Sequence, residues 1–223
     1  MTALVLQARM GSNRLPGKSL LPLGGSSLVE QAMARLALVE ADVRVLATDE
    51  ASAGTLAPAA ERRGFELLVG PAEDVLARYC LAIRRFSPDL VIRATGDNPL
   101  VSHELASLLV ERRKASPSDY AGFRGIPVGM GVELVAAEAL LRAEAEARAG
   151  AEREHVCPYL YGHPELFRID GPEAPEEYRL PGASVTVDTA ADYEAVLRIY
   201  GALFDGAPIP SAAILDYLRG RKP

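Results

Sequence analysis

Cysteine, tryptophan and long apolar runs are scarce or absent in this sequence. Its 223 residues include only two cysteines, Cys80 and Cys157, too few for a disulfide framework and without the spacing of a zinc site. Tryptophan is absent and aromatic residues make up 6%, so no stacking surface for single-stranded nucleic acid is expected. No run approaches the ~18 apolar residues of a membrane span. The short apolar run at 3–6, followed by Arg9, does not fit a signal peptide. We therefore expect a cytoplasmic protein with free thiols and no membrane or nucleic-acid partner.

Positive charge is also in the minority. The formal net charge is −6, and such a surface repels nucleic acids and anionic membranes. An anionic substrate must therefore meet a local basic patch. Hydrophobic residues make up 49%, which is enough for a sizeable core. The length fits one domain over residues 1–223.

Strand and helix patterns alternate through the first half of the chain. This alternation predicts βαβ crossovers and an α/β fold with a mostly parallel sheet, whose ligands bind at the carboxyl ends of the strands. The predicted strands are Ala3–Leu6, Val43–Ala47, Glu66–Val69 and Leu90–Ala94, and the predicted helices are Ser27–Val39, Ser52–Arg63, Glu73–Phe86 and Glu104–Lys114. The second half predicts strands at Val132–Val135 and Val185–Val187, a polar loop at Pro172–Pro181, and helices at Ala136–Ala149, Ala190–Leu203 and Pro210–Arg219.

The loop after the first predicted strand concentrates positive charge. Residues 1–25 contain Arg9, Arg14 and Lys18 and no acidic residue. Glycines such as Gly11 let backbone N–H groups approach an anion, while arginine and lysine bind phosphate oxygens. The spacing matches neither a Walker A loop nor G-x-G-x-x-G, which disfavours P-loop kinases and dinucleotide oxidoreductases. Composition alone leaves a triphosphate site and a solvated basic turn about equally favoured.

The run Gln-Ala-Arg-Met-Gly-Ser-Asn-Arg-Leu-Pro-Gly-Lys at 7–18 resembles the signature of the cytidylyltransferases of the spore-coat polysaccharide biosynthesis protein F family. These are relatives of the CMP-sialate and CMP-Kdo synthetases. Shorter segments at 73–79, 93–100, 153–156 and 187–189 are similar to family motifs and follow in family order. The resemblance implies a three-layer, Rossmann-like nucleotidyltransferase fold, similar to the glycosyltransferase A type, with helices on both faces of the sheet.

The resemblance also implies roles for individual residues. Asp97 and Asp188 would bind a Mg²⁺ ion that bridges the CTP phosphates. Spacing alone would instead make Asp97 a turn residue and Asp188 a helix N-cap. The residues expected at the nucleotide are Gln7, Ala8, Arg9, Gly11, Ser12, Arg14, Lys18, Asp74, Arg78, Thr95 and Asp97.

Two further groups of residues concern the start of a predicted helix and the acceptor site. Asp74 and Arg78, one helical turn apart, fit either a nucleotide contact or a surface ion pair. The resemblance places the acceptor site, and a possible dimer contact, within 116–182. The residues expected at the acceptor are Glu133, Arg153, Glu154 and His155, where Arg153 would pair with a carboxylate and His155 would orient or deprotonate a hydroxyl. Gly131 stands where the family often has an aspartate, which weakens the expected acceptor contact.

The function predicted from sequence is transfer of CMP from CTP to a small acidic sugar or related acceptor, by a homodimer. Arg9, Arg14, Lys18, Asp97 and Asp188 are the expected catalytic residues. Two alternatives keep the fold: a sugar-1-phosphate nucleotidyltransferase, or a glycosyltransferase, which would favour an Asp-x-Asp metal site that 95–97 lacks. A third alternative is a nucleotide-binding module without catalysis.

Overall fold

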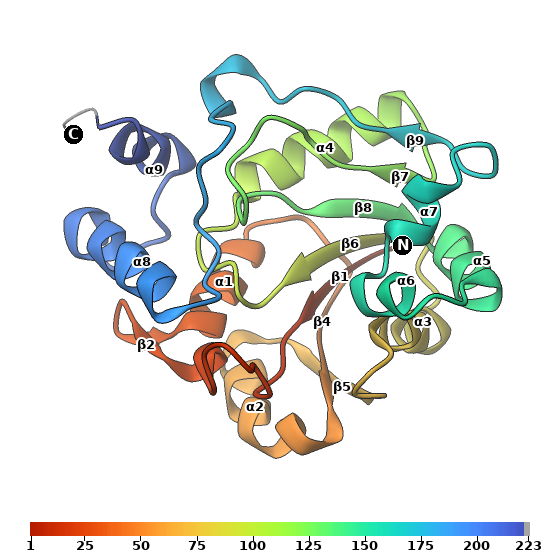
Figure 1. Cartoon of the computed structure of the whole chain (residues 1–223), viewed down its shortest axis with the longest axis horizontal. Coiled ribbons are helices and arrows are strands. Elements are labelled where there is room, and N and C mark those ends of the chain that lie inside the picture. Colours follow the sequence, from red (N-terminus) through yellow and green to blue (C-terminus); the bar gives the residue numbers. More distant parts are fainter. Residues whose placement is uncertain (221–223) are drawn as a thin grey trace.

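The computed structural model describes residues 1–220, built around a seven-stranded sheet (Figure 1). Its strand order is β5-β4-β1-β6-β8-β7-β9, and only β8 runs antiparallel to its neighbours. The outward progression from β1 through β4 to β5, with β6 on its other side, is that of a doubly wound sheet. The strands are β1 (Thr2–Gln7), β4 (Val43–Asp49), β5 (Glu66–Gly70), β6 (Leu90–Thr95), β7 (Tyr120–Ala121), β8 (Glu133–Ala136) and β9 (Ile169–Asp170).

Strand β1 lies at the centre of the parallel strands because its side chains are apolar on both faces. Ala3 and Val5 belong to one core cluster, and Leu4 and Leu6 belong to another; all four are fully buried. Continuous apolar runs of this kind are typical of parallel strands covered by helices on both sides. Both β1 and β6 end at the same edge of the sheet, where Gln7 pairs with Thr95.

Helices cover both faces of this sheet, as predicted. One core cluster packs residues of α1, α2 and α4 against the sheet, and the other packs α3, α5 and α7 against the opposite face, where α6 lies beside α3. These helices are α1 (Leu28–Leu36), α2 (Glu50–Arg63), α3 (Val75–Phe86), α4 (His103–Ala115), α5 (Ala137–Glu146), α6 (Gly150–His155) and α7 (Pro158–Gly162). Helices α8 (Ala190–Leu203) and α9 (Ser211–Leu218) form a third cluster beside the hairpin of β2 (Pro22–Leu23) and β3 (Ser26–Ser27).

A buried network of hydrogen bonds connects α9 to α1 and α4, which pack against the sheet. The fully buried Arg35 of α1 donates from Nε to the carbonyl of Val101 (2.5 Å) and from Nη2 to Ser211 Oγ (3.3 Å). Glu104 of α4 accepts from the backbone N–H of Ser211 (3.0 Å) and from its hydroxyl (2.6 Å). Burial opposes the charge on Glu104, but these hydrogen bonds outweigh it and lower its pKa from 4.5 to about 2.

The fold class and the larger elements are confirmed, with ends that differ by a few residues. The predicted strand at Val185–Val187 is wrong: Ser184 makes only an isolated bridge with Val128, and Val187 N then donates to the Asp97 carbonyl (2.9 Å). The segment bonds first to Val128 and then to Asp97, so it forms no continuous β-ladder with either partner. Helices α6 and α7, strands β7 and β9, and the short 3-10 helices η1 (Lys18–Leu20) and η2 (Glu176–Tyr178) were not predicted. Across residues 1–220, no helix is long and apolar enough to cross a membrane.

Candidate active site

A cavity of about 410 Å³ lies at the carboxyl ends of β1 and β6. This is the edge at which ligands bind in doubly wound sheets. Most of the predicted site residues share this cavity, although they come from four distant parts of the chain. Those that line it are Gln7, Ala8, Arg9, Gly11, Ser12, Arg14, Lys18, Thr95, Asp97, Glu154, His155 and Asp188.

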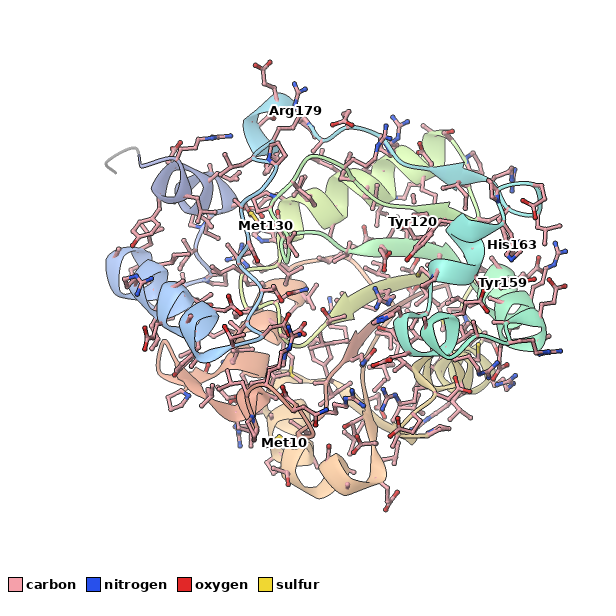
Figure 2. All side chains as sticks on the ribbon, in the orientation of Figure 1. Met10, Tyr120, Met130, Tyr159, His163 and Arg179 are labelled. Atoms are coloured by element: carbon pink, nitrogen blue, oxygen red, sulfur yellow. The ribbon has the colours of Figure 1, made fainter. Side chains whose placement is uncertain are left out.

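The basic loop wraps around one wall of this cavity because it folds back on itself. The carbonyl of Met10 accepts from the N–H of Gly17 (3.3 Å), and the Ser19 hydroxyl donates to the carbonyl of Arg9 (3.1 Å). Gly17 has φ +72°, a left-handed conformation that glycine adopts at little cost. Lys18 then begins η1 with its side chain directed into the cavity. Figure 2 labels Met10 on this loop, beside α2.

The carboxylates of Asp97 and Asp188 both contact the ammonium of Lys18 in this cavity. Lys18 Nζ lies 3.0 Å from Asp97 Oδ2, 2.9 Å from Asp188 Oδ1 and 2.8 Å from the carbonyl oxygen of Val187. Arg14 Nη2 also lies 3.0 Å from Asp188 Oδ1. Asp97 follows β6 and Asp188 precedes α8, so the fold joins residues 91 positions apart (188 − 97). The alternative that Asp188 caps α8 is wrong, because the capping residue is Thr189.

The oxygen atoms at this point suit a hard divalent cation that arrives with phosphate. Within residues 1–220 no cluster of three or more His, Cys, Asp or Glu side chains could hold a metal ion by itself. Mg²⁺ is commonly held by one or two carboxylates together with substrate phosphates and water. The Asp97 and Asp188 oxygens already converge on one cation, the Lys18 ammonium. The donor set therefore fits a metal shared between protein and nucleotide.

A second, larger cavity of about 860 Å³ adjoins the first and shares Arg93 and Thr95 with it. Arg93 of β6 forms a largely buried ion pair with Glu133 of β8, and the Tyr120 hydroxyl donates to Glu133 Oε1 (2.7 Å). Burial opposes the charge on Arg93, but Glu133 outweighs it and raises the pKa of Arg93. Burial and Glu133 both raise the pKa of Tyr120, which Figure 2 labels beside these strands. Arg124 also lines this cavity.

The structure does not bring Arg153 to the second cavity. Its guanidinium instead binds Asp74 through Nε (2.6 Å) and Nη2 (2.5 Å), and neither residue lines either cavity. The alternative of a surface ion pair between Asp74 and Arg78 is therefore wrong. Arg78 is fully buried, and none of its guanidinium nitrogens has a hydrogen-bond partner within the described part of the chain. Burial lowers the pKa of Arg78, and Asp49 partly opposes this.

Glu154 and His155 lie in the first cavity, although they were expected at the acceptor. Arg9 Nη2 lies 3.9 Å from Glu154 Oε1, so α6 closes the cavity opposite the basic loop. Glu133 is the one residue predicted for the acceptor that lines the second cavity.

Arg93 and Asn98 were not predicted as site residues. Asn98 donates to Thr95 Oγ1 (2.8 Å) and lines the second cavity, while its own Oδ1 is buried without a partner among residues 1–220. One signal for Arg93 was present, since a charged residue within the apolar run of β6 needs a polar partner in the sheet. The sequence could not identify that partner as Glu133, 40 residues away.

The sheet is doubly wound and its first loop is cationic. Asp97 and Asp188, opposite this loop, fit a metal bound to phosphate. This arrangement is that of a nucleotidyltransferase. The sequence pattern of the family described as cytidylyltransferase matches residues 3–217. The chain belongs to this cytidylyltransferase family, which makes it a CTP-dependent nucleotidyltransferase.

Individual relatives agree with this assignment. The chain is 35% identical over 226 aligned positions to the spore coat polysaccharide biosynthesis protein SpsF of Bacillus subtilis, with 98% of this chain and 94% of that protein covered. A solved cytidylyltransferase from Leptospira borgpetersenii superimposes with a TM-score of 0.90 at 26% identity, covering 98% and 94% of the two chains. A CMP:2-keto-3-deoxy-manno-octonic acid synthetase, solved with CTP, shares the fold at a TM-score of 0.71 and 18% identity, covering 90% and 98%.

Proposed function

We propose that this enzyme transfers CMP from CTP to a small acidic sugar or a related acceptor, with release of pyrophosphate, in the synthesis of surface polysaccharide precursors. The observation that carries the proposal is the convergence of Lys18, Asp97 and Asp188 in a cavity walled by the cationic loop. The similarity to a spore coat polysaccharide biosynthesis protein favours the pathway.

The reaction is a single in-line displacement. An acceptor oxygen attacks the α-phosphorus of CTP, the bond to the β-phosphate oxygen breaks, and pyrophosphate leaves. Arg9, Arg14 and Lys18 stabilise the charge that grows on the leaving group, and backbone N–H groups at Gly11 and Ser12 assist them. Mg²⁺ held by Asp97 and Asp188 supplies further electrostatic stabilisation of the phosphates when bound. Gln7, Ala8 and Thr95, at the strand ends, contact the base and ribose.

The second cavity receives the acceptor. It joins the nucleotide cavity at Arg93 and Thr95, so a molecule within it can approach the α-phosphate. Its charged lining consists of Arg93, Arg124 and Glu133, an excess of one positive charge that favours an acidic acceptor. Much of this lining falls in residues 120–133, 161, 169 and 171, which supports segment 116–182 as the acceptor subregion. His155 is the proposed acceptor of the hydroxyl proton.

Two properties complete the proposal. CTP is a cytoplasmic metabolite, so we place the reaction in the cytoplasm. The family resemblance alone favours a homodimer, with segment 116–182 at or near the contact.

Pyrophosphate release tests this function directly. The purified protein is incubated with Mg²⁺ and each nucleoside triphosphate, alone and with a panel of sugar acids and neutral sugars. We expect acceptor-dependent pyrophosphate from CTP, together with a CMP conjugate detected by mass spectrometry. Release from UTP or GTP but never from CTP would refute the assignment of the base. Activity with neutral sugars alone would refute the acidic acceptor.

A further inference from the structure

All three cations of the basic loop are paired with acids of the cavity. Lys18 contacts Asp97 and Asp188, and Arg14 contacts Asp188. Arg9 lies 3.9 Å from Glu154. The groups proposed to bind phosphate are therefore already engaged with carboxylates. Phosphate binding must replace these contacts.

Lys18 shows most clearly that binding the two acids and binding a phosphate are mutually exclusive. A lysine ammonium has three N–H donors. In the structure all three have acceptors, at 2.8, 2.9 and 3.0 Å, from Val187 O, Asp188 Oδ1 and Asp97 Oδ2. The side chain is only 12% exposed, so water does not readily take the place of these oxygens. Lys18 has no donor left for a phosphate while it holds both acids.

We propose that Lys18 is the resident counter-ion of the Asp97–Asp188 pair and exchanges these carboxylates for phosphate oxygens when substrate binds. This inference rests on the proposed function. Lys18 and Arg14 bring two positive charges to two carboxylates, and a divalent cation brings the same two charges. The charge around the two acids therefore stays balanced when Arg14 turns to phosphate together with Lys18. Lys18 opposes binding of the metal alone, and the two acids oppose binding of the triphosphate alone.

The first experiment measures metal binding without nucleotide. Mn²⁺ is titrated into the whole protein and followed by electron paramagnetic resonance or calorimetry. Lys18→Met removes the ammonium but keeps the length of the side chain, so we expect Mn²⁺ to bind on the order of tenfold more tightly than to wild type. The matched control is Arg9→Met, which removes the same charge from the same cavity but not from the acid pair. We expect it to change Mn²⁺ affinity by less than about threefold.

The second experiment measures nucleotide binding without metal. CTP is titrated in the presence of EDTA. Asp97→Asn removes the negative charge that holds Lys18 at this contact and leaves only a neutral acceptor, so we expect metal-free CTP to bind on the order of tenfold more tightly. Glu154→Gln is the control, because it removes one negative charge from the same cavity without touching Lys18. We expect a much smaller effect from it, because Glu154 lies 3.9 Å from Arg9 and the two side chains are 54% and 36% exposed, so this contact is weak.

The outcomes separate this inference from the function on which it rests. Tighter binding in both variants, with small changes in both controls, supports the exchange. Ordinary CTP turnover by the wild type, together with unchanged affinities in Lys18→Met and Asp97→Asn, would overturn the exchange alone. Equal gains in variants and controls would show a general effect of charge and would also overturn it. Failure of the wild type to bind CTP with Mg²⁺ would overturn both.

Discussion

Replacing Arg93 by methionine tests whether the wall between the two cavities depends on a buried charge. The side chains of Arg93 and Glu133 are only 17% and 22% exposed, and Glu133 has one further hydrogen bond, from Tyr120. The variant keeps an apolar stem but leaves the carboxylate without its cation. Breaking a buried ion pair in this way costs about 3 kcal/mol. For a chain of 223 residues this corresponds to a fall in Tm of roughly 6–12 °C.

The assay is a double-mutant cycle followed by urea and thermal unfolding. Arg93→Met is compared with Glu133→Gln and with the double variant. Glu133→Gln should cost a similar amount, because it leaves the Arg93 guanidinium without its anion. Because the double variant removes both charges, we expect it to recover most of the loss and to be more stable than either single variant. Arg84→Met is the matched control: Arg84 pairs with Glu144 but is 53% exposed, so its loss should stay below about 1 kcal/mol.

Two results would refute this reasoning. Equal losses in Arg93→Met and Arg84→Met would show that burial of the pair does not matter. A double variant as unstable as the sum of its single variants would show that Arg93 and Glu133 do not interact. As a functional readout, we expect Arg93→Met to raise the KM for the acceptor more than the KM for CTP.

Three further predictions follow from other parts of the molecule. Asp97→Ala and Lys18→Ala should each lower kcat roughly 100–1000-fold, because Lys18 acts on the phosphates directly and Asp97 acts through the metal that it would hold. Circular dichroism and Tm should stay near wild type, and wild-type turnover would remove these residues from the mechanism. Glu104 has a lowered pKa, so its stabilisation is complete above pH 4.5 and is lost as the pH falls toward 2. The loss is about 3 kcal/mol by urea unfolding. Ser211→Ala removes the hydroxyl hydrogen bond but keeps the backbone one, so it should flatten this dependence in part. Gly129→Ala should lower the free energy of unfolding by about 2 kcal/mol and weaken acceptor binding. Gly129 has φ +90°, and an added Cβ would lie 2.8 Å from the backbone N of Thr186. An unchanged Tm would contradict this.

The sequence was sufficient for the features that depend on local pattern. The apolar run of β1, the glycines that follow it and the surplus of cations before residue 25 are all contiguous, so they indicated a candidate phosphate-binding loop at a strand end, which the family resemblance then favoured over a solvated turn. The alternation of strands and helices predicted the parallel sheet. Helix α8 begins and ends at the predicted residues because its first turn is capped by Thr189 and Asp192.

Features that depend on distant pairing were not accessible in the same way. Asp74 and Arg78 are one helical turn apart, but helix α6 brings Arg153 to Asp74 while Arg78 turns into the core. The second cavity is assembled from β6, β7, β8, the loop at 122–132, Tyr161 of α7 and the region of β9, and no local motif describes it. The homodimer stays a prediction from resemblance.

The contact between the two cavities has a consequence for how enzymes of this type diversify. Arg93 and Thr95 form a common border, but beyond it most of the walls come from separate stretches of the chain: the loop after β1 with Asp97 and Asp188 on one side, and residues 120–133 with Tyr161 on the other. Apart from Glu133, which pairs with Arg93, mutations in the latter stretch can accumulate without disturbing the phosphate chemistry. Selection could therefore supply one ancestral catalyst with many different acceptors.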